Sequence, residues 1–377
     1  MSNELEMMNI FLCVVDCGRY DRFQNRETAS FINSLADSGM KFTNAISPYN
    51  QTQSAMASMF TGLLPSEHLM QSHRDDRFGV GLEKPTLAEK LKEFGYTTIG
   101  ASAMYWMHPM FGWARGFDHF ACTATVGEDG GVSCYNMFSE IAGTLKPPFF
   151  LYMQVGDVHI PYSYPRAFKE EFDNEYDASL KYLDLQLRAI HAELPENTAI
   201  VITADHGVGL GEHDGNAWGQ GPNSWLYDEI IHVPTIIYNT GKDNKVIDDI
   251  FNTKDLYDLL VNGKLLLGDY TISESYAYHH SSCIHKNLND VGRERCMKGY
   301  RCIVGREHKL IESEDGEFFF FNRKDEDTQI NDPDPLLISE LKDSLAAGSS
   351  MNLKDRRQDI AKRRMEEELH NISKGNN

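Results

Sequence analysis

Continuous apolar runs recur along the chain and alternate with segments of helical periodicity. Runs in which nearly every position is apolar are typical of strands buried on both faces of a sheet. These runs lie within residues 9–16, 147–162, 197–207 and 232–239. Helical spacing lies within residues 27–39, 51–62 and 176–194, and residues 86–102 predict a helix, a glycine stop and a strand. The alternation predicts an α/β fold with a mostly parallel central sheet and helices on both of its faces.

The pattern changes near residue 270. Residues 274–280, 300–313 and 316–324 predict short antiparallel strands, and residues 334–347 predict a helix. We therefore expect three parts: an α/β domain over residues 1–268, a smaller α+β subdomain over residues 269–346 and a charged tail over residues 347–377. The tail is expected to be helical or disordered, because its apolar stripe is sparse.

The formal net charge of −20 over 377 residues narrows the range of partners. Nucleic-acid binders present basic surfaces and an acidic surface repels anionic membranes, so we expect no nucleic-acid partner. No apolar stretch reaches the roughly 20 residues that span a bilayer, so no membrane span is expected. The N-terminus lacks the basic region of a signal peptide, and the seven cysteines lack C-x-x-C spacing. These features predict a cytoplasmic protein and leave its oligomeric state open.

Acidic and imidazole side chains follow three of the predicted strands. Asp16 ends the first strand, His159 follows the strand within residues 147–162, and Asp205 and His206 end the strand within residues 197–207. Each has an ordinary explanation, because an Asp at a strand end is commonly a cap and a His in a loop commonly has no special role. Since the carboxyl ends of parallel strands meet at one edge of a sheet, these side chains together predict a metal site. The helix start near residue 52 adds hydroxyls and free backbone N–H groups, which suit an anion.

Several longer segments carry ordered motifs. They are "NIFLCVVDCGRYDRF", "TNAISPYNQTQSAMASMFTGLLPSEH", "GDVHIPY", "TADHGVGLGEH", "YDEIIHVPTIIY" and "HKLIESEDGEFFFFN". Together they resemble the sulfatase branch of the alkaline phosphatase superfamily, from about Asn9 to about Leu345. The resemblance implies an alkaline-phosphatase-like fold, in which residues 1–268 form the catalytic domain. It also implies that the Asp after the first strand binds a metal and that the second segment carries the nucleophile.

The nucleophile segment departs from that of true sulfatases, which carry Cys or Ser in a Cys-x-Pro-Ser-Arg motif that is oxidised to formylglycine. Thr52 stands at the nucleophile position, and Ser54, Ala55 and Met56 stand where Pro, Ser and Arg would. A threonine there resembles the phosphoglycerol and phosphoethanolamine transferases of the same superfamily. Threonine is a weak nucleophile that needs a metal to activate it, so the resemblance implies a metal-bound Thr52. Ser54 is the rival nucleophile.

The resemblance implies a divalent cation held by Asp16, Thr52, Asp205 and His206. Cys17 replaces the second Asp common in calcium-binding sulfatases, and His206 replaces an Asn. Two carboxylates and an imidazole favour Mn²⁺ as the first choice, with Zn²⁺, Mg²⁺ and Ca²⁺ as the other candidates. A second cation would need further ligands such as His159 or His213, and a single cation is the simpler interpretation.

Four further residues are candidates for contacts with the substrate. His159 is predicted to contact the oxygens of the transferring group or to protonate the leaving alkoxide. His213 is a candidate for anion binding, and Arg19 suits either anion binding or a structural salt bridge. The lysine that sulfatases carry near "AWGQG" is missing and Gln220 is the closest residue, which weakens the case for a sulfate monoester. Lys309 lies in a family-like stretch and is assigned no chemistry.

These residues predict a metal-dependent hydrolase or transferase of phosphate or sulfate esters, with a small-molecule or glycan-linked substrate. Thr52 would attack phosphorus or sulfur to give a covalent intermediate, which water or an acceptor hydroxyl then releases. A phosphodiester is preferred, because a phosphoryl-threonine needs attack at phosphorus to clear. Two alternatives stay open: a strict sulfatase that uses an unmodified hydroxyl, and a catalytically silent binding protein that kept the fold.

Overall fold

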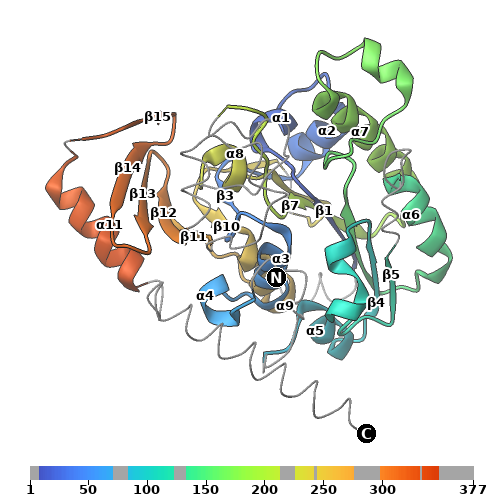
Figure 1. Ribbon diagram of the computed structural model, residues 1–377. Helices are drawn as coiled ribbons and strands as arrows, with labels where there is room; N and C mark the ends of the chain where they lie inside the picture. The colour runs from blue at the N-terminus through green and yellow to red at the C-terminus, as the bar shows by residue number, and fades with distance from the viewer. Residues whose placement is uncertain are drawn as a thin grey trace, which may run out of the picture.

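The computed structural model describes residues 8–70, 84–122, 133–212, 226–241, 244–275, 298–331 and 333–347. The larger of its two main sheets has eight strands in the order β5-β4-β6-β1-β7-β8-β2-β9 (Figure 1). Their bounds are β1 (Asn9–Val15), β2 (Met40–Phe42), β4 (Thr97–Ser102), β5 (His119–Cys122), β6 (Phe149–Val155), β7 (Thr198–Ala204), β8 (Thr235–Tyr238) and β9 (Lys245–Ile247). Strand β8 runs antiparallel to β7 and β2, and every other neighbouring pair is parallel. The prediction of a mostly parallel sheet is therefore confirmed.

Helices cover both faces of the large sheet, because its central strands are apolar on both sides. Alternate side chains of β1 enter different cores, so that Ile10 packs on one side of the sheet and Phe11 on the other. The first face is covered by α3 (Thr52–Thr61), α5 (Leu87–Glu93) and α9 (Leu256–Asn262). The second face is covered by α2 (Ser30–Ser38), α6 (Cys134–Ile141) and α7 (Glu175–Glu193). Burial on both faces explains why β1, β6 and β7 are continuous apolar runs.

The C-terminal sheet is antiparallel throughout and lies beside the large sheet, with one helix along its outer face (Figure 1). Its strands are β11 (Tyr270–Ser275), β12 (Tyr300–Gly305), β13 (His308–Ser313), β14 (Phe318–Asn322) and β15 (Asp325–Gln329). Helix α11 (Pro335–Ala347) packs on it through Leu341 and Leu345. This sheet and helix are the expected α+β part, and β15 is a strand that the sequence pattern did not predict. The boundaries at residues 268 and 346 stay predictions, and residues 348–377 lie outside the described ranges.

Shorter elements fill the connections. Strands β3 (Ala45–Ile46) and β10 (Phe251–Asn252) form a two-stranded parallel sheet. The remaining α-helices of the described residues are α1 (Tyr20–Phe23), α4 (Pro65–His68) and α8 (Asp228–Ile231). Within the described residues, no helix combines the length and the apolar character needed to cross a membrane.

Buried charges join the C-terminal sheet to the large domain. Lys309, on β13, is fully buried, and its Nζ lies 2.7 Å from Asp228 Oδ1 and 2.6 Å from the carbonyl oxygen of Leu226. Lys309 Nζ also bonds Glu326, and Arg323 donates to Asp228 Oδ2 at 2.8 Å. Burial raises the pKa of Asp228, but Lys309 and Arg323 outweigh burial and hold it well below its usual value. Loss of one partner from such a buried network costs about 3–5 kcal/mol, so Lys309 has a structural role.

His232, which follows α8, has an imidazole that is largely enclosed by its neighbours. Its Nε2–H donates to the carbonyl oxygen of Thr43 at 2.8 Å, and its ring stacks on Tyr20 with centroids 4.0 Å apart. Burial lowers the pKa of His232 to about 4, although the nearby Asp228 opposes the shift. The folded protein therefore favours the uncharged form of this histidine.

We predict that His232 makes the protein lose stability as the pH falls from about 6.5, where an unfolded histidine begins to take up a proton, towards 4. This contribution is at most about 3 kcal/mol and is fully present above pH 6.5. His232→Gln keeps a donor for Thr43 and should flatten the decline. Denaturant unfolding between pH 4 and 7 measures this loss of stability. His119→Gln, which replaces an exposed histidine, is the control. Equal slopes for all three proteins would contradict the prediction.

Candidate active site

Three neighbouring strands bring the predicted site residues to one edge of the large sheet. Strands β6, β1 and β7 are adjacent and parallel, so their carboxyl ends lie side by side. Asp16 follows β1, Asp205 and His206 follow β7, and His159 lies in the loop after β6. Thr52 is the first residue of α3, so its hydroxyl faces the same edge. The structure therefore brings together the five residues that the strand ends and the helix start had singled out.

The Thr52 hydroxyl lies between two potential proton acceptors. Its Oγ1 is 3.1 Å from Asp16 Oδ2 and 3.2 Å from His206 Nε2, and the residue is 8% exposed. His206 Nδ1 lies 2.6 Å from the carbonyl oxygen of Gly207, which can only accept, so this nitrogen carries the hydrogen. The other ring nitrogen, Nε2, is therefore the one that faces the Thr52 hydroxyl. Gly207 must be a glycine, because a Cβ there would meet the carbonyl oxygen of Glu229 at 2.1 Å.

Two carboxylates are buried side by side at this edge. Asp16 and Asp205 are both 0% exposed, and Gln154 Nε2 lies 3.3 Å from an oxygen of each. Burial and the charge of Asp16 raise the pKa of Asp205 well above its usual value. The Tyr152 hydroxyl donates to Gln154 Oε1 at 2.8 Å, which turns the amide N–H groups of Gln154 towards the carboxylates. Sequence reasoning missed Gln154, although a lone polar residue in the run "FFLYMQV" was a usable signal.

The donor set fits a divalent cation. One ligand atom each from Asp16, Asp205 and His206 lies within 4.8 Å of the others. Neither carboxylate forms an ion pair with a lysine or arginine in the part of the chain that the structure describes. The basic side chain near them is the imidazole of His206, whose Nε2 lies 3.8 Å from Asp205 Oδ2. Two buried carboxylates without a lysine or arginine repel each other, and a cation would remove that repulsion. Two carboxylate oxygens, an imidazole nitrogen and the Thr52 hydroxyl are ligands that Mn²⁺, Zn²⁺ and Mg²⁺ accept.

Ser54 and Ser47 have structural contacts. Ser54 Oγ donates to the carbonyl oxygen of Met70 at 2.6 Å, and the residue is fully buried. Ser47 Oγ bonds the backbone carbonyl oxygens of Tyr49 and Asp205, which ties the segment before α3 to the end of β7. Ser47 had no signal in the sequence, because its partners are backbone atoms far along the chain.

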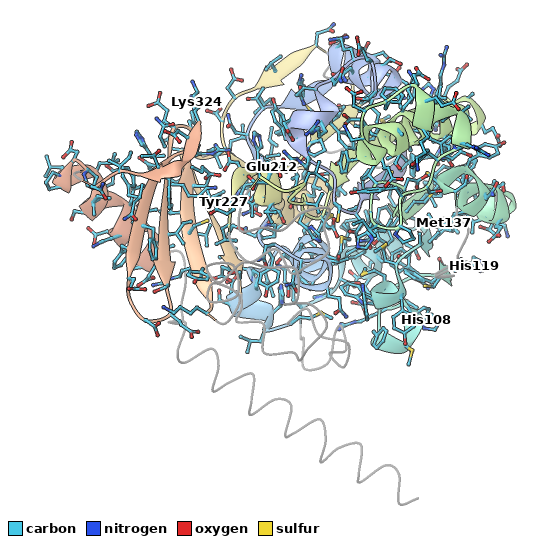
Figure 2. The ribbon with its side chains drawn as sticks, turned by 45° about the horizontal axis from the view of Figure 1, so that its top comes forward. His108, His119, Met137, Glu212, Tyr227 and Lys324 are labelled. Atoms are coloured by element: carbon cyan, nitrogen blue, oxygen red, sulfur yellow. The ribbon has the colours of Figure 1, made fainter. Side chains whose placement is uncertain are left out.

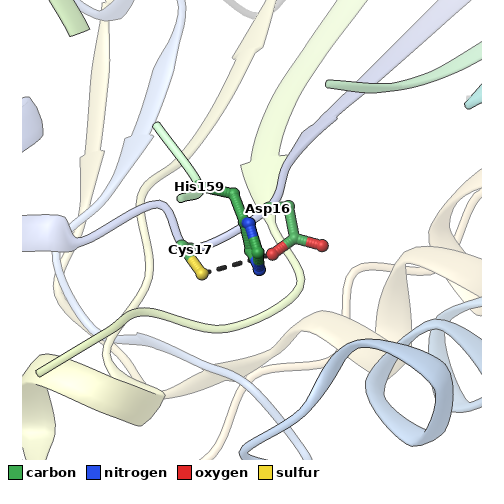
Figure 3. A group of neighbouring side chains, drawn as sticks. All are labelled: Asp16, Cys17 and His159. Carbon is green, nitrogen blue, oxygen red and sulfur yellow. Dashed lines mark hydrogen bonds between the residues drawn. The ribbon is translucent and has the colours of Figure 1, made fainter. Parts of the chain in front are cut away.

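His159 lies close to Asp16 and Cys17 (Figure 3). The thiol of Cys17 lies 3.2 Å from Asp16 Oδ1. His159 Nδ1 bonds the carbonyl oxygen of Ile160, which can only accept, so Nδ1 carries a hydrogen. Nε2 is the ring nitrogen that can gain or lose a proton. Asp157, at the start of the same loop, accepts a hydrogen bond from Gln186 Nε2 at 2.7 Å, which anchors the loop to α7.

Arg19 is buried and bound to carboxylates of the protein. Its Nε and Nη2 donate to Asp21 at 2.9 Å, and its Nη1 donates to Glu212 at 2.6 Å and to the carbonyl oxygen of Val208 at 3.1 Å. Glu212 lies in the region between the two main sheets (Figure 2). These bonds tie the segment after His206 to α1, which is the structural salt bridge that the sequence left open. Anion binding by Arg19 stays a prediction.

His213 and Gln220 lie outside the described residues, so their predicted contacts with the substrate also stay predictions.

Comparison with known proteins relates part of the chain to sulfatases. Human iduronate 2-sulfatase is 35% identical over 96 residues, which is 24% of this chain and 16% of the relative. The uncharacterised sulfatase YdeN of Escherichia coli (strain K12) is 24% identical over 274 residues, which is 55% of this chain and 48% of the relative. The chain thus matches less than half the length of these two curated relatives.

Solved structures share the fold over almost the whole chain. The phosphonate monoester hydrolase of Silicibacter pomeroyi has a TM-score of 0.67 at 15% identity, covering 89% of this chain and 93% of its own. The structure of BT4656 in complex with its substrate D-glucosamine-2-N,6-O-disulfate has a TM-score of 0.67 at 13% identity, covering 94% and 98%. The family model described as Sulfatase matches residues 19–260, which is more than half of the sequence. The chain, with its alkaline-phosphatase-like fold, therefore belongs to the sulfatase family.

Proposed function

We propose that the chain is a metal-dependent hydrolase or transferase of phosphate or sulfate esters, with Thr52 as its nucleophile. The observation that carries the proposal is the position of Thr52 Oγ1, 3.1 Å from Asp16 Oδ2 and 3.2 Å from His206 Nε2. Both acceptors are also proposed ligands of the cation, so the cation would lower the pKa of the hydroxyl and the proton would leave to solvent. Ser54 is a weaker candidate, because its hydroxyl is buried and donates to Met70.

Asp16, Asp205, His206 and Thr52 are the residues proposed to hold the cation, and Mn²⁺ is our first choice. A bound divalent cation lowers the pKa of a coordinated hydroxyl and offsets charge on the ester oxygens. The chain's own contribution is to hold the four ligands before the substrate arrives. Gln154 orients both carboxylates, and the bond from His206 Nδ1 to Gly207 sets its tautomer.

His159 is proposed to act on the leaving group. Its Nδ1–H is bound to Ile160, so Nε2 is the atom that would carry a proton to the leaving oxygen or would contact an oxygen of the transferring group. The loop that carries His159 begins at the end of β6, next to Asp16. This placement supports a role on the side of the ester away from Thr52.

A phosphodiester is our preferred substrate class, on a small molecule or a glycan. Thr52 lacks the sulfur or primary hydroxyl from which sulfatases make formylglycine, and a threonine ester must be released by attack at the central atom. The similar structures include a phosphonate monoester hydrolase and a protein bound to a sulfated glucosamine, so both chemistries occur on this fold. Sulfate-ester hydrolysis by an unmodified Thr52 is the second candidate, favoured by the family match. A cytoplasmic location also stays a prediction.

Thr52→Ala should lower turnover of a nitrophenyl phosphodiester by a factor of about 10³ or more, because the attacking oxygen is removed. Metal content should stay close to that of the wild type, since Asp16, Asp205 and His206 remain. Steady-state assays on the phosphodiester and on nitrophenyl sulfate, run beside elemental analysis, provide the measurement. Ser54→Ala is the matched control and should keep most activity. Equal turnover by Thr52→Ala and the wild type would rule out Thr52, and a wild type inactive on both esters would favour a silent binding protein.

Asp205→Asn should stabilise the metal-free protein, because it removes one of two buried carboxylates that repel each other. Without metal, the stability of the wild type should fall as the pH rises above about 4, where an unfolded Asp ionises while Asp205 keeps its proton. The variant should lack this slope. Added Mn²⁺ should raise the wild-type unfolding free energy, by about 2.7 kcal/mol at 100 times Kd, and should raise that of the variant less. Thermal melts of both proteins in chelator and in Mn²⁺ measure these differences in stability. The prediction would be contradicted if Asp205→Asn were less stable than the wild type in chelator and were stabilised as much by Mn²⁺.

A further inference from the structure

Asp16 also belongs to a second cluster of metal-ligating atoms. One ligand atom each from Asp16, Cys17 and His159 lies within 4.8 Å of the others, and the three side chains converge in Figure 3. This cluster shares only Asp16 with the group formed by Asp16, Asp205 and His206. The two groups are therefore neighbouring sites joined by one carboxylate.

The two carboxylate oxygens of Asp16 have different hydrogen-bond partners. Oδ2 accepts from Thr52, the first residue of α3, at 3.1 Å and from Gln154, on β6, at 3.3 Å. Oδ1 accepts from the Cys17 thiol at 3.2 Å, on the side of His159. A carboxylate divided in this way can bind one cation through each oxygen, as the bridging carboxylates of two-metal sites do.

The backbone around Cys17 is held in a conformation that directs its thiol to Asp16. Cys17 has a φ of 65°, in the left-handed region that non-glycine residues rarely adopt. The Tyr176 hydroxyl donates to the carbonyl oxygen of Cys17 at 2.9 Å and accepts from the N–H of Arg19 at 3.0 Å. Gly18 lies so close to β7 that a Cβ would meet Ala204 Cβ at 2.8 Å. The turn after β1 is thus anchored on both sides of Cys17.

His159 has the orientation of a metal-binding histidine. Its Nδ1–H is bound to the carbonyl oxygen of Ile160, which leaves the Nε2 lone pair available. Metal-ligating histidines commonly donate their other ring N–H to a backbone carbonyl in this way. The N–H of His159 also donates to the carbonyl oxygen of Gly156 at 3.0 Å, so the residue is fixed against the end of β6.

We propose that Asp16, Cys17 and His159 bind a second divalent cation, and that this cation is Zn²⁺. Thiolate, imidazole and carboxylate together are typical zinc ligands, and three protein ligands leave one position open for water or an ester oxygen. Binding breaks the S–H bond of Cys17, forms a Zn–S bond and releases the proton to solvent. The proposal extends the proposed function, because it places the second cation beside the metal site that holds Thr52. With Zn²⁺ bound, His159 Nε2 would be a ligand and could not carry a proton, so the cation would replace His159 in offsetting the charge on the leaving oxygen.

Cobalt reports on the cysteine directly, because thiolate-bound Co²⁺ has a near-ultraviolet charge-transfer band. Metal-free full-length protein titrated with Co²⁺ should show this band, and Cys17→Ser should lose it. Cys122→Ser is the matched control, since Cys122 lies on β5 outside the cluster, and it should keep the band. Asp205→Asn should also keep the band, because its substitution affects only the first site.

Equilibrium dialysis with Zn²⁺ counts the cations. The wild type should bind two equivalents, and Cys17→Ser and Asp205→Asn should each bind one. Cys17→Asp keeps an oxygen ligand and should bind two equivalents without the cobalt band, which separates loss of a ligand from misfolding. No thiolate band in the wild type would overturn the proposal, as would a single equivalent whose band disappears in Asp205→Asn. Failure of Thr52 as the nucleophile would leave both readouts unchanged, so the two proposals fail independently.

Discussion

The repulsion between Asp16 and Asp205 is the constraint on which the site depends. Both carboxylates are fully buried, and the amide of Gln154 is a neutral donor shared between them. Burial of two like charges is costly unless an opposite charge joins them. Burial and, after it, the charge of Asp16 raise the pKa of Asp205, in keeping with this cost. A protein that keeps such a pair in its core needs either a bound cation or a retained proton, and the choice between them couples metal binding to stability and to pH.

The large sheet makes this close approach unavoidable. Val15 of β1 pairs with Val155 of β6 and with Ala204 of β7, so the next residues along β1 and β7 emerge together. The N–H of Asp16 donates to the carbonyl oxygen of Val155 at 2.9 Å, which holds Asp16 in line with its strand. Apolar packing on both faces fixes the register of the three strands. The energy that holds the carboxylates together therefore comes from the cores above and below the sheet.

Much of the site was predictable because its signals are local. An acidic residue directly after a buried strand singled out Asp16 and Asp205. The helix start indicated hydroxyls near residue 52, and the resemblance to the sulfatase family selected Thr52 among them. Gln154 was a polar exception in an apolar strand and could have been recognised. Ser47 could not, because its role depends on contacts with backbone carbonyls, one of them more than 150 residues away in the chain. Arg19 was ambiguous in sequence, since an arginine beside a site binds an anion or a carboxylate equally well. In the structure its donors are bound to Asp21 and Glu212.

The order of apolar runs and polar strand ends determined the fold class and the set of residues that meet at the sheet edge. That is so because strand burial and side-chain alternation are properties of neighbouring residues. Tertiary structure alone decided which oxygen of Asp16 faces Thr52 and which faces Cys17, and which histidine nitrogen keeps its lone pair. These choices depend on distances between segments that are far apart in the chain, and on partners such as the carbonyl oxygens of Gly207 and Ile160. A pattern of residue types carries no information on such distances, because backbone atoms are the same at every position.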